Sequence, residues 1–89
     1  MKYTVVYSKQ SIKDLKKLNR SIAVFIKSWI EKNLVGCENP RMHGKALKGN
    51  LATLWRYRIG DYRLVCDIRD NECIILAVAI GHRREVYRL

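Results

Sequence analysis

The stretch LWRYRIGDYRLV, residues 54–65, is the feature that most constrains how this chain can fold. Apolar residues alternate with arginines on both sides of Gly60-Asp61, a two-residue turn signal typical of a β-hairpin. Such a turn fixes the pairing of the strands, so Arg58 is expected opposite Arg63. Because successive side chains of a strand point to opposite faces, one face is expected to be apolar and the other basic. The apolar face comprises Trp55, Tyr57, Ile59, Tyr62, Leu64 and Cys66, and the basic face comprises Arg56, Arg58 and Arg63.

The basic face of this hairpin sets like charges against each other. Like charges directly across a strand pair are destabilising, on the scale of the roughly 0.2–1 kcal/mol that a good pair contributes. A solvated basic face is one interpretation. The other is a bound phosphate, whose oxygens match the guanidinium fork better than they match an ammonium group. The formal charge of +10 also indicates a polyanionic partner: nucleic acid, an anionic membrane surface or an acidic protein.

The remaining patterns predict a single α+β domain over residues 1–89, with element order β-α-α-β-β-β. A two-helix hairpin is expected to pack on a mostly antiparallel four-stranded sheet. Ser8 is the expected N-cap of a helix to about Leu18, and Ser21 that of a second helix to about Leu34. Phe25 and Trp29 are expected core anchors of the second helix. The expected strands are 2–7, 54–59, 62–69 and 72–80; residues 35–53 are expected to form a loop, and Asp70-Asn71 a two-residue turn.

Cysteine usage and apolar runs bear on location and on metals. The three cysteines are odd in number and show no CxxC spacing, which is typical of reduced thiols in a cytoplasm. Together with the two histidines they match no common zinc-ligand spacing, so no metal or other cofactor is expected. There is no signal-peptide pattern, and the longest apolar run, residues 73–80, is too short for a membrane span. A cytoplasmic protein is therefore predicted.

The C-terminal stretch GHRREVYRL, residues 81–89, adds further groups beside the sheet: His82, Arg83, Arg84, Tyr87 and Arg88. A histidine with several arginines and a tyrosine, but without clustered carboxylates, does not resemble a glycosidase or a magnesium site. The set suits metal-free attack of a ribose 2′-hydroxyl on its own phosphodiester. Cations would stabilise the developing charge, and one group would move protons. His82 is the candidate for that group, although a lone histidine is also often structural.

Three segments resemble the RelE toxins of bacterial and archaeal toxin–antitoxin systems, within the wider RelE/ParE group. They are YSKQSIKDLKKL, NPRMHGKALKGNLATLWRYRIGDYRLV and AVAIGHRREVYR, which together cover most of the chain. The combination of G-x-YRLV with a terminal GHR-x-x-VY is more specific than either piece alone. The resemblance implies a β-α-α-β-β-β fold and metal-free cleavage of messenger RNA in the ribosomal A site. The implied products are a 2′,3′-cyclic phosphate and a 5′-hydroxyl.

The resemblance also implies roles for individual residues. Arg63 matches the arginine that contacts the scissile phosphate, Arg83 the one that stabilises the transition state, and Tyr87 the ring that orients a nucleotide. Arg56 and Arg58 stand where the best-studied member has two lysines, one of them proposed as general base. Arginine is effectively never deprotonated, so Arg58 is expected to hold phosphate and His82 to transfer protons. The expected RNA-binding residues are Arg56, Lys45, Lys48, Arg84 and Arg88.

Two other functional classes remain open from the sequence. ParE-type relatives share the fold and poison DNA gyrase without a nuclease site, and a basic domain can also bind RNA without cutting it. The expected partners are messenger RNA, the A site of the 30S ribosomal subunit and a RelB-like antitoxin. That antitoxin would be acidic or amphipathic and would wrap the toxin. The helix lysines either contact ribosomal RNA or form a solvated face: Lys9, Lys13, Lys16, Lys17 and Lys27.

Overall fold

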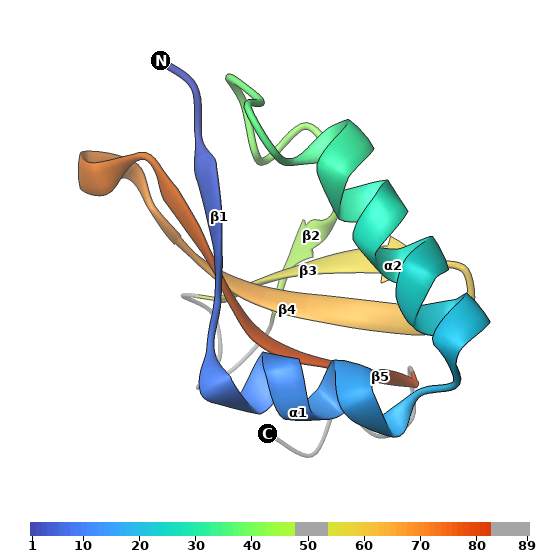
Figure 1. Ribbon diagram of the computed structural model, residues 1–89. Helices are drawn as coiled ribbons and strands as arrows, with labels where there is room; N and C mark the ends of the chain where they lie inside the picture. Colours follow the sequence, from blue (N-terminus) through green and yellow to red (C-terminus); the bar gives the residue numbers. More distant parts are fainter. Residues whose placement is uncertain (48–53, 83–89) are drawn as a thin grey trace.

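The computed structural model describes residues 1–47 and 54–82, which form two helices and one five-stranded sheet (Figure 1). The elements in chain order are β1 (Thr4–Tyr7), α1 (Lys9–Lys17), α2 (Arg20–Asn33), β2 (Lys45–Ala46), β3 (Leu54–Ile59), β4 (Tyr62–Arg69), a 3₁₀ helix (Asp70–Glu72) and β5 (Ile74–His82). The strand order across the sheet is β1-β5-β4-β3-β2. Only β1 and β5 run parallel, and the other neighbours are antiparallel. The predicted α+β class and element order are confirmed, with one strand more than the four expected.

The additional strand, β2, lies inside the segment that was predicted to be a loop. It has two residues, Lys45 and Ala46, which pair with Arg56 and Trp55 of β3. Two residues carry no recognisable alternation, so the sequence gives no local signal for such a strand. It exists because the preceding loop is held against β3 by contacts between residues far apart in sequence.

The helix boundaries agree with the prediction, but the cap of α2 does not. Ser8 caps α1 as expected, with its hydroxyl oxygen accepting a hydrogen bond from the Ser11 amide at 3.1 Å. In α2 the cap is Asn19, whose Oδ1 accepts the Ile22 amide at 3.0 Å. Ser21 sits in the first turn instead and donates its hydroxyl to Asn19 at 2.8 Å. Both residue types are good caps, and the extended backbone at Asn19 decides between them.

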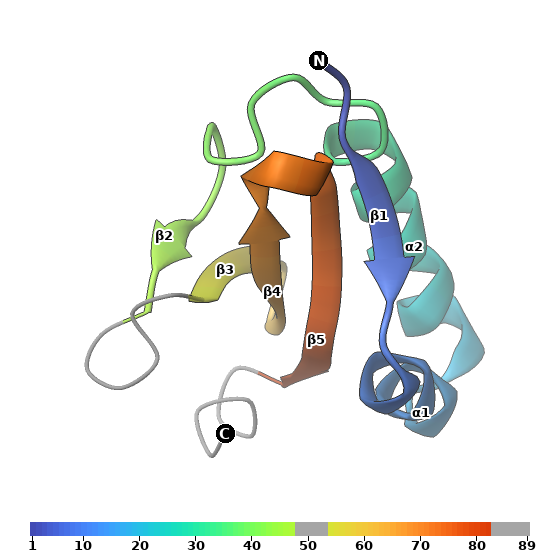
Figure 2. The ribbon, with the colours of Figure 1, turned by 90° about the vertical axis from the view of Figure 1, so that its left-hand side faces the viewer.

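Helix α2 covers one face of the sheet and buries the core there, while helix α1 runs alongside β5 where β1 ends (Figures 1 and 2). The buried core residues are Ile26, Ile30, Leu34, Tyr57, Ile59, Leu64, Cys66, Ile75, Ala77 and Ile80. The expectation for Phe25 was wrong, because its side chain is 53% exposed. α2 turns Ile26 and Ile30 toward the sheet, and Phe25 lies one residue, about 100° of helix rotation, away from that stripe. Trp29 is half-buried and packs against the core, as predicted.

The hairpin has the predicted register. Arg58 pairs with Arg63, Tyr57 with Leu64, and Arg56 with Val65. Gly60 takes a φ of 62°, which the tight turn requires and glycine adopts without strain. Tyr57 and Leu64 are fully buried, whereas Arg58 is exposed, so the apolar and basic faces separate as expected.

The connection from β4 to β5 differs from the predicted two-residue turn. Residues 70–72 form a 3₁₀ turn, Cys73 follows in the left-handed conformation with φ 52°, and β5 starts only at Ile74. At its other end β5 continues to His82, two residues beyond the predicted limit. His82 is therefore part of the sheet rather than of the segment that follows it.

Helix α1 takes the place of a strand beside the second half of β5. β1 ends at Tyr7, opposite Ala77, so no strand of the described part of the chain lies beside β5 on this side beyond that point. The Ser8 amide donates to the carbonyl of Ala77 at 3.0 Å, and the Ser8 hydroxyl donates to that of Val78 at 3.1 Å. Further along, the Oδ2 atom of Asp14 accepts the amide of Ile80 at 2.9 Å.

We expect the variant Asp14→Ala to unfold more easily than the wild type. It leaves the amide of Ile80, a residue only 4% exposed, without its acceptor, which costs about 1–3 kcal/mol. Asp14→Asn keeps an acceptor oxygen and should lose less. Gln10→Ala is the matched control, since it removes only the exposed amide that donates to Oδ1 of Asp14 at 2.9 Å. Urea titration measures all three, and an equal loss in Gln10→Ala and Asp14→Ala would contradict the assignment.

Candidate functional site

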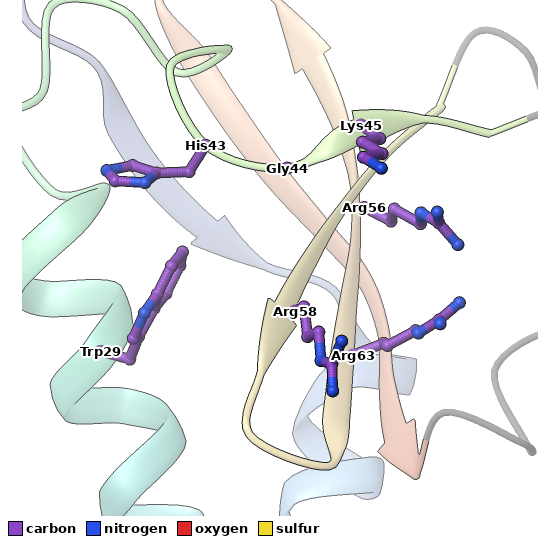
Figure 3. Close-up of a pocket in the computed structure, with 7 residues that line it drawn as sticks. All are labelled: Trp29, His43, Gly44, Lys45, Arg56, Arg58 and Arg63. Atoms are coloured by element: carbon purple, nitrogen blue, oxygen red, sulfur yellow. The ribbon is translucent and has the colours of Figure 1, made fainter.

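A cavity of about 450 Å³ opens at the outer edge of β3 (Figure 3). β2 pairs only with Trp55 and Arg56, so the rest of that edge has no strand beside it among the described residues. The residues that line the cavity are Trp29, His43, Gly44, Lys45, Arg56, Arg58 and Arg63. They come from α2, from the loop before β2, from β2 itself and from the hairpin, and none of these lining residues is acidic.

The hairpin side of the cavity is a concentrated positive charge. Arg58 and Arg63 are direct cross-strand partners, and Lys45 is the cross-strand partner of Arg56. Arg56 and Arg63 are half-buried and Arg58 is exposed. Figure 3 shows the guanidinium ends of Arg56 and Arg63 directed to the same side of the hairpin. Among the described residues, four cations and no carboxylate line the cavity, which makes a site complementary to a phosphate; guanidinium groups bind phosphate through paired hydrogen bonds.

The loop before β2, which contributes His43 and Gly44 to the cavity, is fixed to β3 by two side chains of that strand. The buried Tyr57 hydroxyl donates to the carbonyl of Pro40 at 2.5 Å. Burial raises the pKa of Tyr57 well above its usual value, so the phenol remains protonated and keeps donating. The indole Nε1 of Trp55 donates to the carbonyl of His43 at 2.7 Å. These bonds tie residues 40–43 to a strand more than ten positions later in the chain.

Gly44 allows this loop to lie directly against β3. Its φ is 82°, in the left-handed region that residues with a side chain rarely adopt. A Cβ atom at this position would lie 2.2 Å from the carbonyl oxygen of Arg56 and 2.7 Å from Nε1 of Trp55. No side chain fits there without a backbone shift. Glycine thus sets the position of its two neighbours, His43 and Lys45, at the cavity.

A polar cluster also holds Arg41 of this loop to the β4–β5 turn and to Tyr3, the residue before β1. Nη1 and Nη2 of Arg41 each donate to one carboxylate oxygen of Asp70 at 3.0 Å, and the Tyr3 hydroxyl donates to Oδ1 at 2.6 Å. The hydrogen bonds from Arg41, and secondarily from Tyr3, lower the pKa of Asp70 below its usual value. The cluster is therefore strongest while Asp70 is ionised.

We expect Asp70→Asn to destabilise the protein at neutral pH but not in acid. A carboxyl whose pKa is lower in the folded than in the unfolded state adds stability above its unfolded pKa of about 3.9. That stability is lost as the pH falls through the lower, folded pKa. The urea midpoints of wild type and Asp70→Asn should thus differ at pH 7 and converge in strong acid. Because the cluster is exposed, the difference should also shrink in high salt; a pH-independent difference would contradict this origin.

The structure brings together four of the residues that the sequence predicts for the site: Lys45, Arg56, Arg58 and Arg63. His82 is not among the cavity residues. It pairs with Tyr62, and the two rings meet edge to face with centroids 5.8 Å apart. Tyr62 packs on the core side of the sheet, so His82 lies on that face, and the partner of Arg63 is Gly81. The remaining predicted residues lie outside the described part of the chain: Lys48, Arg83, Arg84, Tyr87 and Arg88.

A β-bulge explains the position of His82. Val65 pairs with Ala79 but Cys66 with Ala77, so Val78 is an extra residue in β5. Strict alternation from the buried Ala77 would turn residue 82 toward the arginines. The extra residue reverses the alternation and turns His82 to the core side.

Three residues of the cavity were not predicted from the sequence to belong to the site: Trp29, His43 and Gly44. Trp29 was assigned only to the core, and His43 was considered only as a zinc ligand. The one available signal was the triplet His43-Gly44-Lys45 in a basic loop. That signal does not indicate which strand the loop will contact.

Two negative findings apply to the described residues. In residues 1–47 and 54–82 there is no group of three or more His, Cys, Asp or Glu side chains placed to hold a metal ion. Over the same ranges, neither helix combines the length and the apolar character needed to cross a membrane.

The family model described as "ParE toxin of type II toxin-antitoxin system, parDE" matches residues 5–87. Toxin RelG of Mycobacterium tuberculosis is 31% identical over 88 residues, which cover 99% of each chain. Toxin RelE of the same organism is 31% identical over 87 residues, covering 98% of this chain and 88% of the relative.

Solved structures show the same architecture. The toxin–antitoxin complex RelBE2 from M. tuberculosis contains a chain that superposes with a TM-score of 0.79 and 26% identity, covering 93% of this chain and 100% of that one. A mutant of Escherichia coli toxin RelE in the free state superposes with a TM-score of 0.76 and 23% identity, over 99% and 93% of the two chains. At that level of identity the second comparison concerns the fold alone.

Proposed function

Because this chain belongs to the RelE/ParE superfamily of toxins from type II toxin–antitoxin systems, we propose that it is a ribosome-dependent messenger RNA endoribonuclease. The observation that carries the proposal is the pairing of Arg58 with Arg63 beside a cavity lined by four cations. Without an anionic ligand, the repulsion between these like charges destabilises the folded protein. A phosphodiester supplies that anion at every nucleotide of an RNA chain.

The proposed reaction needs no metal. The ribose 2′-oxygen forms a bond to the adjacent phosphorus while the bond from phosphorus to the 5′-oxygen breaks. One proton leaves the 2′-hydroxyl and another reaches the departing 5′-oxygen, which leaves a 2′,3′-cyclic phosphate and a 5′-hydroxyl. Arg58 and Arg63 would stabilise the charge that develops on the non-bridging oxygens. Arg83 and Tyr87 take the roles that the resemblance implies, transition-state stabilisation and nucleotide orientation.

The residue that transfers the proton is a separate part of the proposal. Arginine is effectively never deprotonated, so the arginines of the cavity are poor bases. The role of His82 stays a prediction, and its place on the core side of β5 requires that substrate reach it around the end of the sheet. The variant His82→Gln tests this proton-transfer role, because it removes the imidazole while the backbone pairing of residue 82 with Tyr62 remains.

We expect little cleavage of naked RNA by the isolated protein. Without a strong base in the arginine cavity, much of the rate has to come from placing the 2′-hydroxyl in line with the breaking bond. Positioning of that kind is worth several orders of magnitude in rate. Purified protein should therefore cut a messenger RNA bound in programmed ribosomes far faster than the same RNA in solution. Equal rates with and without ribosomes would overturn the ribosome dependence.

The match to a ParE toxin model favours gyrase inhibition as the second candidate function. One paired experiment separates the two. Messenger RNA ends are mapped after the toxin is expressed, and DNA gyrase supercoiling is assayed with the purified protein. Cuts within translated codons support the endoribonuclease. Inhibition of supercoiling without cuts supports the gyrase poison, and RNA binding with neither effect supports a non-catalytic RNA-binding domain.

An antitoxin is the expected protein partner. Solved structures with the same fold include toxin–antitoxin complexes from M. tuberculosis, E. coli and Pyrococcus horikoshii. We propose that a RelB-like antitoxin neutralises this chain with an acidic or amphipathic segment that covers the basic cavity, and that both act in the cytoplasm. Growth arrest by the toxin should then be relieved when the antitoxin is co-expressed.

A further inference from the structure

The cavity has a second wall, formed by two rings on the side opposite the arginine cluster (Figure 3). Trp29 rises from α2 toward the imidazole of His43, and the two ring centroids are 5.9 Å apart at an interplanar angle of 70° (Figure 3). Trp29 is also in contact with the buried Tyr57, at 5.7 Å between centroids. The exposed His43 ring thus rests on a half-buried indole that is itself anchored in the core.

The backbone that carries His43 is held at its carbonyl and at the residue that follows. Its carbonyl accepts the indole N–H of Trp55, and the next residue is Gly44, packed against the Arg56 carbonyl. The His43 ring in turn contacts the Trp29 indole. A ring presented in this way loses little conformational entropy when a ligand contacts it.

Rings on one wall and guanidinium groups on the other are complementary to the two ends of a nucleotide. A phosphate on Arg58 and Arg63 leaves its base to extend across the cavity toward the rings. The volume of about 450 Å³ lies within the range of roughly 300–1,000 Å³ that is typical of small-molecule sites. Aromatic side chains are the usual platforms on which proteins stack unpaired bases of RNA.

We propose that His43 and Trp29 form a base-binding wall for a nucleotide of the RNA whose phosphate lies on Arg58 and Arg63. The inference rests on the proposed endoribonuclease function and adds to it a subsite that selects or orients a base. Stacking, rather than proton transfer, is the role assigned to the imidazole, because the ring is directed toward Trp29 and away from the guanidinium groups (Figure 3).

Substitutions at His43 test the wall on programmed ribosomes. His43→Ala should lower kcat/KM by roughly 10- to 100-fold, the range expected for one lost stacking contact. His43→Phe keeps a ring without a titratable proton and should cut at nearly the wild-type rate. Met42→Ala is the matched control, because Met42 is a neighbour in the same loop, is 74% exposed and does not line the cavity. Equal loss in His43→Ala and His43→Phe would overturn stacking in favour of proton transfer.

A binding measurement separates failure of this inference from failure of the proposed function. A trinucleotide with 2′-O-methyl riboses cannot be cleaved and is added to the full chain, followed by NMR. The signals of the Trp29 indole and the His43 ring should shift with the trinucleotide but not with inorganic phosphate. Unmoved rings, or unchanged cleavage by His43→Ala in a preparation whose wild type cuts, would overturn the base wall alone. Absence of cuts by the wild type would instead overturn the endoribonuclease.

Discussion

Replacing Arg63 by alanine is expected to abolish growth arrest and to slow ribosome-dependent cleavage by roughly 100- to 1,000-fold, the usual effect of removing one donor to a developing oxyanion. Arg63 lies opposite Arg58 in the cavity and contributes one of its two central guanidinium groups. Circular dichroism should show a folded variant. Loss of toxicity together with unfolding would contradict the assignment of Arg63 to the chemistry.

The companion variant Arg58→Gln is expected to lower activity without lowering stability. It removes one of two like charges that face each other across the hairpin, so the free energy of unfolding should stay equal or rise by up to about 1 kcal/mol. Cleavage should nevertheless fall sharply. Arg69→Gln is the matched control, an exposed arginine of β4 that pairs with Asp67 rather than lining the cavity. If Arg58→Gln leaves cleavage unchanged, the basic face is only a solvated surface.

The second large effect is expected for Gly44→Ala. A residue with a side chain in the left-handed conformation costs about 1–2 kcal/mol. At Gly44 a Cβ atom would also lie 2.2 Å from the Arg56 carbonyl oxygen. The variant should therefore either lose more folding stability than that conformational cost, or its loop should move away from β3. In either case His43 and Lys45 would no longer be held in their places at the cavity. Urea unfolding measures the first outcome, and ribosome-dependent cleavage measures the second.

Gly36→Ala is the matched control for this experiment. Gly36 has a φ of 75°, close to the 82° of Gly44, but a Cβ atom there would meet nothing within 4 Å. The two variants therefore share the conformational cost and differ only in the close approach. A clearly larger loss of stability in Gly44→Ala assigns the excess to contact with β3. Equal losses would show that the loop is not held by that approach.

The hairpin could be predicted from the sequence because its geometry is local. Gly60-Asp61 sets a two-residue turn, the turn sets the register, and the register places Arg58 opposite Arg63 with Tyr57 and Leu64 on the other face. The start of α1 at Ser8 was predictable for the same reason, since a cap depends only on the next turn of helix. Interactions within a few residues suffice for each of these features.

The errors arose where distant contacts decide the outcome. β2 and the loop before it are positioned by Tyr57 and Trp55, more than ten residues later. Phe25 is excluded from the core by the way α2 rotates on the sheet. His82 is turned to the core side by a single extra residue, Val78, whose carbonyl is held by Ser8 of the first helix cap. Alternation counted along one strand cannot reveal a bulge that depends on two neighbouring elements.

The sequence by itself determined that this chain would carry a row of arginines on one face of a hairpin, because turn length and strand alternation are local properties. The tertiary structure decided what stands opposite those arginines. It placed a ring from α2 and a ring from the loop before β2 beside them, and it turned His82 away. The physical reason is that these placements follow from packing and hydrogen bonds between segments far apart in the chain, which no local pattern of residues encodes.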